Sequence, residues 1–136
     1  MKFRYCIIMS GILFLCIHNA GRSQMAAGFA RELSNGDVVI LSGGSEPAAT
    51  VNPVAVDVMN EIGIDISTYV PQKFNDDLLN AVDVVVTMGC GDTCPYIPGK
   101  RYVDWPLDDP KGKSIEDVRR IRDEIKAHVT DLLAQL

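Results

Sequence analysis

The chain has few of the side chains that usually bind structural metals, with two histidines and four cysteines among 136 residues. Its most closely spaced cysteines, Cys90 and Cys94, have no second pair of ligands at a suitable spacing, which argues against a zinc site. No apolar run reaches the ~18 residues of a membrane span without polar breaks. Positive charge is also scarce, because 13 Lys and Arg are outnumbered by 18 Asp and Glu. We therefore expect no metal requirement in catalysis, no membrane association and no nucleic-acid partner.

A chain of this length is expected to form one domain, residues 1–136. Its core is expected to be large enough to be stable without disulfide bonds. We therefore interpret the four cysteines as reduced thiols of a cytoplasmic protein. Lys2 and Arg4, followed by apolar residues, imitate a signal peptide, but no small-residue cleavage site follows them before the loop at 16–23. Residues 1–8 are expected to be an N-terminal extension outside the core, because Met9 offers an alternative start.

Residues 12–33 predict a strand, a tight loop and a helix in succession. Residues 12–16 are a short apolar run, typical of a buried parallel strand. The next residues are polar or small, and residues 23–33 have the apolar spacing of an amphipathic helix. A strand, loop and helix in this order aim backbone N–H groups and the positive end of the helix dipole at an anion. The sequence therefore predicts an anion-binding loop between the strand and the helix.

The rest of the chain repeats the alternation of strand and helix. Further strands are expected at 38–41, 82–88 and 101–104, and further helices at 53–62, 75–80 and 114–134. This order predicts an α/β fold with three layers, in which a four-stranded parallel sheet has helices on both faces. Ligands bind such sheets at the carboxyl ends of the strands. The loops that carry Cys16, Cys90 and Asp109 all follow strands, so we expect them at this edge.

Cys16 begins the predicted anion loop, and Arg22 follows six residues later. Loop N–H donors, the helix start and a guanidinium all stabilise a thiolate, so we interpret Cys16 as a nucleophile. Arg22 has the planar fork that holds a tetrahedral oxyanion through two hydrogen bonds. Asn19 is expected to fix the loop through side-chain hydrogen bonds, whereas His18 is interpreted as a solvated or packed imidazole.

Two further pairs of residues leave alternatives open. Asp108 and Asp109 lie in the loop after the fourth strand, where either carboxyl group suits the role of general acid. Cys90 and Cys94 are separated by three residues, a spacing that a flexible loop can close as a disulfide. These two cysteines are therefore either a redox pair or spectators.

The segment from Cys16 to Ser23, followed by Gln-Met-Ala, resembles the anion loop of arsenate reductases built on the low-molecular-weight protein tyrosine phosphatase fold. The resemblance covers the chain from about Gly11 and is greatest to the mycothiol-dependent branch, the arsenate-mycothiol transferases. Tyrosine phosphatases of this fold carry aromatic residues after the Asp-Pro pair, whereas Lys111 and Gly112 follow it here. Further similar stretches lie at 44–47, 52–53, 63–65, 86–90, 98–101 and 104–110.

The resemblance implies a reaction by thiol transfer. The Cys16 thiolate attacks arsenate, which is held by the loop and by Arg22, and Asp109 protonates the departing hydroxyl. Mycothiol, as co-substrate, then takes up the arsenic as an arseno-mycothiol adduct, which the glutaredoxin-like protein mycoredoxin reduces to arsenite. The resemblance assigns substrate binding to the loop residues Ile17, His18, Asn19, Ala20, Gly21, Arg22 and Ser23.

Two alternatives remain within this resemblance. In the thioredoxin-coupled branch, a disulfide is relayed through Cys16, Cys90 and Cys94, and thioredoxin is the reductant. Relatives of that branch usually have a longer spacer between the two relay cysteines than this chain does. The other alternative is a low-molecular-weight protein tyrosine phosphatase, whose phosphate substrate is nearly isosteric with arsenate.

Overall fold

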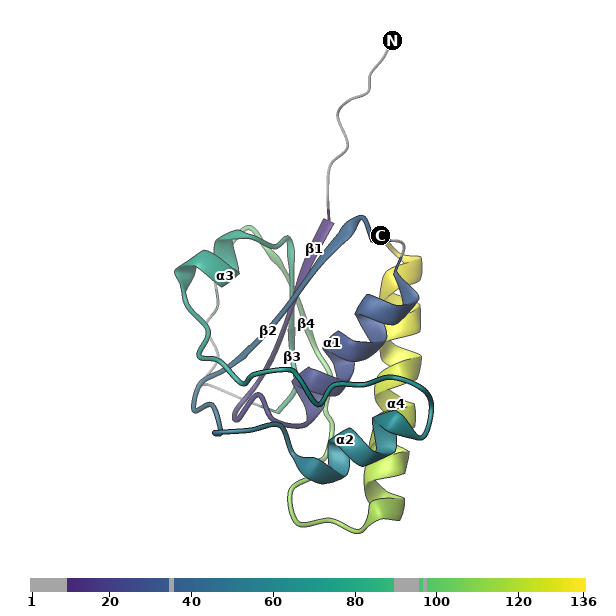
Figure 1. Cartoon of the computed structure of the whole chain (residues 1–136). Coiled ribbons are helices and arrows are strands. Elements are labelled where there is room, and N and C mark those ends of the chain that lie inside the picture. The colour runs from purple at the N-terminus through teal and green to yellow at the C-terminus, as the bar shows by residue number, and fades with distance from the viewer. Residues whose placement is uncertain (1–9, 35, 90–95, 97) are drawn as a thin grey trace.

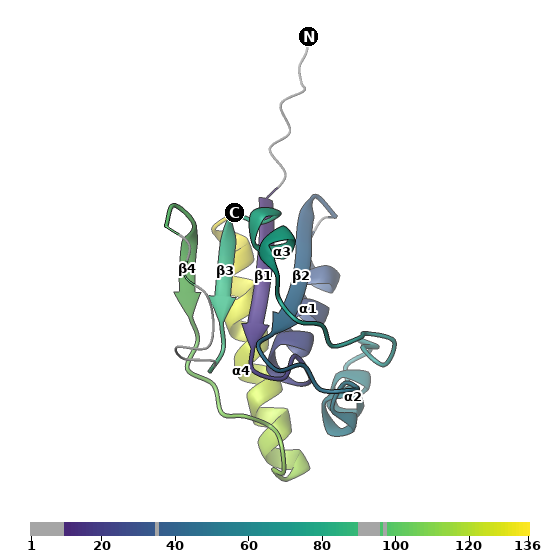
Figure 2. The ribbon, with the colours of Figure 1, turned by 90° about the vertical axis from the view of Figure 1, so that its left-hand side faces the viewer.

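A four-stranded parallel sheet forms the middle layer of the computed structural model, which describes residues 10–34, 36–89, 96 and 98–136. The predicted N-terminal extension and three of the cysteines, Cys6, Cys90 and Cys94, lie outside these residues. The strands are hydrogen-bonded in the order β2-β1-β3-β4, as Figure 2 shows. Their bounds are β1 Ser10–Cys16, β2 Val38–Gly44, β3 Val84–Thr87 and β4 Arg101–Asp104.

Helices cover both faces of the sheet, as the sequence predicts. One face carries α1 (Arg22–Leu33), α2 (Pro53–Asn60) and α4 (Ile115–Ala134), and the other carries the short α3 (Asp76–Asn80), as Figures 1 and 2 show. The three-layer α/β prediction is therefore confirmed. No helix among the described residues is long and apolar enough to cross a lipid bilayer.

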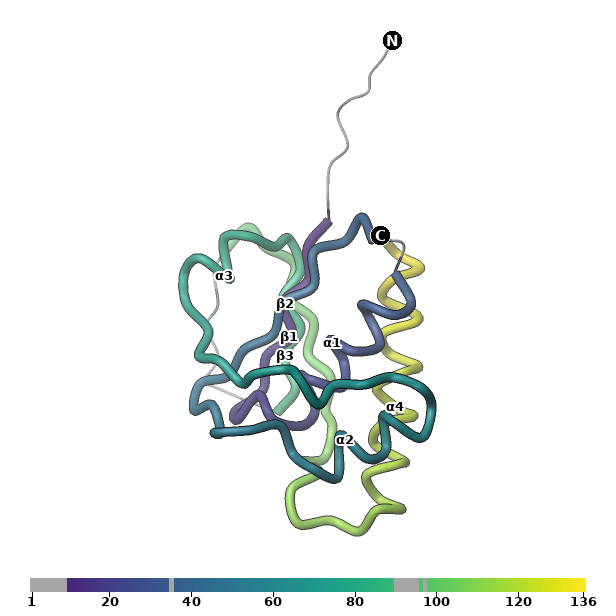
Figure 3. The backbone as a smooth tube through the Cα atoms, viewed as in Figure 1, coloured from purple at the N-terminus to yellow at the C-terminus, as the bar shows by residue number. Residues whose placement is uncertain are grey.

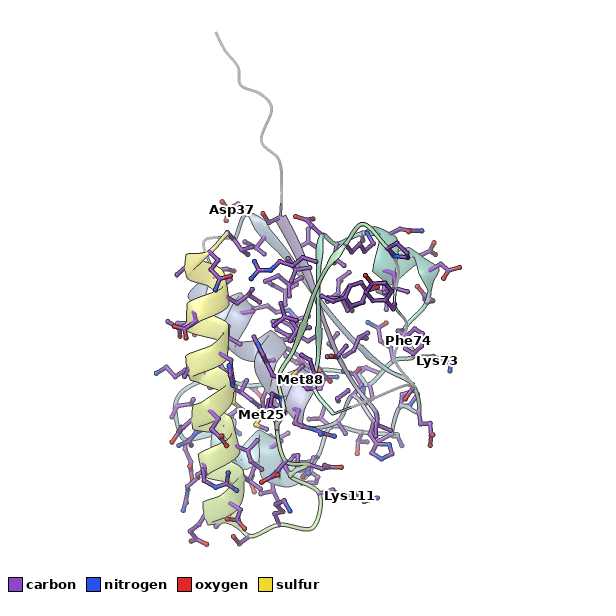
Figure 4. The ribbon with its side chains drawn as sticks, turned by 180° about the vertical axis from the view of Figure 1, so that it is seen from behind. Met25, Asp37, Lys73, Phe74, Met88 and Lys111 are labelled. Carbon is purple, nitrogen blue, oxygen red and sulfur yellow. The ribbon has the colours of Figure 1, made fainter. Side chains whose placement is uncertain are left out.

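The side chains of β1 alternate between two cores, because successive residues of a strand point to opposite faces. Ile12 and Phe14 are fully buried in the larger core with α1, α2 and α4, whereas Leu13 and Leu15 are fully buried in the smaller core. Met25 and Met88, which Figure 4 shows inside the molecule, are fully buried in the larger core. The smaller core includes Leu79, Val82 and Val85.

Side-chain caps start three of the helices where the sequence predicts them. The side chains of Asn52, Asn75 and Ser114 accept hydrogen bonds from backbone N–H groups in the first turns of α2, α3 and α4. The strand β2 is longer than predicted, because it pairs with β1 up to Gly44. Gly43 pairs with Leu15 in this strand, and a Cβ atom at this position would lie 3.2 Å from the backbone nitrogen of Phe74.

An ion-pair cluster joins the end of α2 to α4. Arg122 is 9% exposed, and its Nη1 donates to the carbonyl of Val58 and to Glu61, both at 2.9 Å. Arg119 donates to the same carboxylate at 2.7–3.1 Å. Hydrogen bonds from Arg119, and then from Arg122, hold the pKa of Glu61 below its ordinary value. The cluster fixes α2, and with it the segment that leads from β2 into α2.

Three connecting segments meet at the carboxyl ends of the strands. They are the loop between β1 and α1, the segment from β2 to α2 and the segment from β4 to α4, at the lower end of the sheet in Figure 3. Parallel strands present their carboxyl ends at one edge, so this convergence follows from the topology. The candidate site is built from these three segments.

Candidate functional site

Cys16 is the last residue of β1 and is a buried free thiol, 2% exposed. The backbone N–H of Asn19 donates to its Sγ at 3.2 Å, and the Oγ of Ser23 lies 2.9 Å from the same sulfur. The Nδ2 of Asn19 donates to that Oγ at 2.7 Å, which leaves the hydroxyl hydrogen of Ser23 free to point at the sulfur. The sulfur of Cys16 thus has a backbone donor and a hydroxyl donor in contact with it.

Three carbonyls of the loop, those of Ile17, His18 and Ala20, accept hydrogen bonds from the segment after β2. The loop N–H that donates to the sulfur of Cys16 is that of Asn19. Asn19 has a φ of +50°, which lets consecutive N–H groups converge into an anion-binding concavity. Three backbone amides after β2 donate to these carbonyls at 2.8–2.9 Å: Glu46 to Ile17, Ala48 to His18 and Asn52 to Ala20.

Asn19 fixes the loop through its side chain, as expected from its residue type. It is fully buried, and its Oδ1 accepts hydrogen bonds from the backbone of Gln72 at 2.9 Å and from the side chain of Gln24 at 3.2 Å. Gln24 also donates to the Asn19 carbonyl at 3.0 Å. The sequence analysis missed both glutamines as supports. Gln24 carries a weak signal, a polar residue on the buried face of a helix, and Gln72 carries none because it lies in irregular chain.

Arg22 is the first residue of α1 and is 5% exposed. Its Nη1 donates to the carbonyl of Leu107 at 3.2 Å, and its Nη2 lies 3.6 Å from a carboxylate oxygen of Asp109. Gly89, with a φ of +81°, provides the space for the guanidinium, because a Cβ atom there would lie 2.2 Å from Nη1. Gly44 likewise leaves space for the loop, because a Cβ atom at this position would lie 2.5 Å from the carbonyl oxygen of Ile17. The sequence analysis assigned no role to either glycine.

The two neighbouring aspartates have different surroundings. The carboxylate of Asp108 lies 3.4 Å from Arg120 on α4. The carboxylate of Asp109 lies near Arg22 and accepts from the backbone N–H of Lys111 at 3.0 Å. Asp109 also lines the same cavity as Cys16, and Asp108 does not. The geometry therefore places Asp109 at the site, a choice that the residues alone leave open.

The cavity beside Cys16 has a volume of about 360 Å³. None of the described residues that line it is a phenylalanine, tyrosine or tryptophan. Within the described ranges, no cluster of three or more His, Cys, Asp or Glu side chains is able to hold a metal ion. The predicted redox pair, Cys90 and Cys94, lies outside the described residues. The lining consists of Cys16, His18, Ala20, Gly21, Arg22, Ala48, Thr50, Asn52, Pro53, Asp109, Pro110, Lys111 and Gly112.

Residues 11–136 match the profile of the family described as low molecular weight phosphotyrosine protein phosphatase. The chain belongs to this family. The chain is 44% identical over 124 residues to a relative from Halobacterium salinarum. The aligned residues cover 88% of this chain and 87% of the relative. The chain is 37% identical over 131 residues to the glutaredoxin arsenate reductase of Synechocystis sp., covering 94% of this chain and 99% of that protein.

A solved structure of the family has the same fold. It is the thioredoxin-dependent arsenate reductase of Corynebacterium glutamicum, with a TM-score of 0.82 and 38% identity. The match covers 93% of the present chain and 61% of the Corynebacterium glutamicum chain. The present chain therefore spans less than two thirds of the length of that enzyme. Relatives named as arsenate reductases confirm the resemblance drawn from the loop sequence, and the two named here differ in their redox protein, glutaredoxin in one and thioredoxin in the other.

Proposed function

We propose that this protein is an arsenate reductase that acts by thiol transfer. One observation carries the proposal: Cys16, Arg22 and Asp109 line one cavity, and the backbone N–H of Asn19 donates to the sulfur. A nucleophile, an oxyanion clamp and a general acid in one cavity suit attack on a tetrahedral oxyanion. The names of the relatives support arsenate as that oxyanion.

In the proposed first step, the N–H groups of the loop and the guanidinium of Arg22 hold arsenate against Cys16. The electron pair of the thiolate forms a sulfur–arsenic bond, and a hydroxyl group leaves the arsenic. Asp109 gives a proton to this hydroxyl, which departs as water. The ion pair between Arg22 and Asp109, at 3.6 Å, keeps both side chains within reach of the same oxyanion. No step requires a metal ion.

In the proposed second step, a thiol takes over the arsenic from Cys16. We propose mycothiol as this thiol, with mycoredoxin releasing arsenite from the adduct. A specific observation favours a second candidate, because the similar Corynebacterium glutamicum enzyme is named thioredoxin-dependent. In that case Cys90 and Cys94 relay a disulfide from Cys16 to thioredoxin. Lys111 and Gly112 line the cavity where an aromatic wall would hold phosphotyrosine, which supports arsenate over a phosphotyrosine substrate.

The test measures arsenite formed from arsenate by the purified protein in two reducing systems, mycothiol with mycoredoxin and thioredoxin with its reductase. We expect turnover with mycothiol that is abolished in Cys16→Ser and unchanged in the matched control Cys6→Ser. Cys90→Ser and Cys94→Ser keep mycothiol-dependent turnover if the proposal is right, and lose thioredoxin-dependent turnover if the second candidate is right. Absence of arsenite in both systems refutes arsenate reduction, and full turnover by Cys16→Ser refutes the nucleophile.

A further inference from the structure

His18 lines the cavity beside Cys16, but neither step described above uses its imidazole. Its Nδ1 lies 3.0 Å from the carbonyl oxygen of Glu46, in the segment after β2. A carbonyl oxygen can only accept a hydrogen bond, so Nδ1 carries the hydrogen of this contact. In the neutral ring, Nε2 is then the nitrogen with a free lone pair. The contact agrees with the expectation of a packed imidazole and adds which ring nitrogen carries the hydrogen.

The size of the cavity leaves room for a second reactant next to the oxyanion. Its volume of about 360 Å³ corresponds to roughly twelve waters at ~30 Å³ each, and a tetrahedral oxyanion fills only part of that. Thr50, Asn52 and Lys111 also line this cavity. The side chain of Lys111 extends outward from the segment between β4 and α4, as Figure 4 shows. A second reactant therefore has space beside the oxyanion.

An incoming thiol needs a base because only a few per cent of an ordinary thiol is ionised at neutral pH. The other titratable and charged groups near His18 are less suited to accept this proton. The sulfur of Cys16 is the leaving group of the second step, and the guanidinium of Arg22 is a donor. Asp109 accepts from Lys111 and lies beside Arg22. Glu46 and Lys111 are exposed to solvent, Glu46 does not line the cavity, and a protonated Lys cannot accept a proton.

We propose that Nε2 of His18 is the general base for the thiol that takes up the arsenic, an inference that rests on the proposed function. In this step the S–H bond of the thiol breaks and its proton goes to Nε2. The thiol's electron pair forms the new sulfur–arsenic bond, the Cys16–arsenic bond breaks, and its electron pair returns to Cys16 as thiolate. No oxidation state changes, and His18 later releases the proton to solvent. His18 thus contacts the second reactant and Cys16 the first.

The experiment compares His18→Asn with wild type in mycothiol-dependent turnover from about pH 6.5 to 9.5. The Nδ2 of Asn reproduces the donation to Glu46 but supplies no base, which separates the chemistry from the loop contact. We expect kcat/KM for mycothiol near pH 7 to fall about 100-fold. The difference narrows as the pH approaches about 8.5, where a thiol ionises without help. Added imidazole is expected to restore part of the turnover of His18→Ala.

Two controls keep the outcomes distinct. The only other histidine, His128, stacks on Trp105 at 4.9 Å outside the cavity, so His128→Asn is expected to keep wild-type turnover. The affinity of inorganic phosphate for His18→Asn is expected to equal that of wild type. The role of His18 is overturned if kcat/KM of His18→Asn for mycothiol falls by the same factor at every pH, or does not fall at all. A lower affinity of His18→Asn for phosphate overturns it as well. A wild type without arsenate turnover overturns the proposed function itself.

Discussion

The prediction that tests the site most directly is Gly89→Ala, because Gly89 lies against the guanidinium of Arg22. A Cβ atom at this position would lie 2.2 Å from Nη1, and ordinary contacts begin at 3.4 Å. The guanidinium must therefore move by about 1.2 Å, which breaks its 3.2 Å hydrogen bond to Leu107. A displacement of about 1 Å in a positioning group can cost about 100-fold in rate. We expect a loss of that size in kcat/KM for arsenate.

The same displacement weakens oxyanion binding. A hydrogen bond to a charged group contributes about 1.5–3 kcal/mol, and 1.4 kcal/mol is a factor of about ten in affinity. Loss of one such bond from Arg22 therefore raises the Kd for inorganic phosphate about 10- to 100-fold, which titration calorimetry measures. The φ of +81° at Gly89 adds a separate cost of about 1–2 kcal/mol in folding stability when a Cβ is present.

Gly63→Ala is the matched control for this backbone cost. Gly63 has a φ of +82°, and nothing lies within 4 Å of the Cβ atom that it would gain. We expect the two variants to lose similar folding stability in urea titrations, while only Gly89→Ala loses phosphate affinity. If Gly89→Ala binds phosphate as tightly as Gly63→Ala does, then the position of the Arg22 guanidinium against Gly89 does not determine oxyanion binding, and the reasoning is wrong.

Three further predictions use other parts of the structure. Asp109→Asn is expected to lower kcat for arsenate at least 100-fold, while Asp108→Asn, whose carboxylate contacts α4, keeps wild-type kcat; equal losses would contradict this assignment. Glu61→Gln is expected to lower Tm at neutral pH. Because Arg119 lowers the pKa of Glu61, the ion pair stabilises the fold above about pH 4.5, and this stabilisation disappears as acid protonates the carboxylate. A Tm difference between variant and wild type that persists in acid would refute the ion pair as the cause. Asn19→Gly removes the side-chain hydrogen bonds but tolerates the positive φ, so urea titrations are expected to show a free energy of unfolding lower by about 1–3 kcal/mol. Asn19→Ala is expected to lose more, because alanine also strains at the φ of +50°. Equal losses in the two variants would mean that this φ carries no strain.

Sequence reasoning succeeded where the signal is local. The order of strands and helices follows from apolar periodicity, and the caps at Asn52, Asn75 and Ser114 each depend on residues within one turn. The anion loop is also local, since a strand, a loop and a helix lie within residues 10–33. The fold and the position of Cys16 at a strand end could therefore be predicted.

The missed features depend on contacts between distant segments. The space that Gly89 gives to Arg22 joins two residues far apart in the chain, and neither has a pattern that predicts the other. The choice of Asp109 over Asp108 depends on which way two adjacent side chains point. The fixed tautomer of His18 depends on a carbonyl in the segment after β2. Each needs the three-dimensional structure because its partner is set by topology, not by spacing.

The central place of β1 has a consequence for how the protein is made. This strand is synthesised first, yet it pairs on one side with β2 and on the other with β3, which begins at Val84. A nascent or truncated chain that ends after α2 therefore has one edge of β1 without its strand partner. An unpaired strand edge is a template for association with other chains. Aggregation during biosynthesis is thus a cost of building the nucleophile's strand into the middle of the sheet, and the yield of folded protein depends on how soon β3 follows.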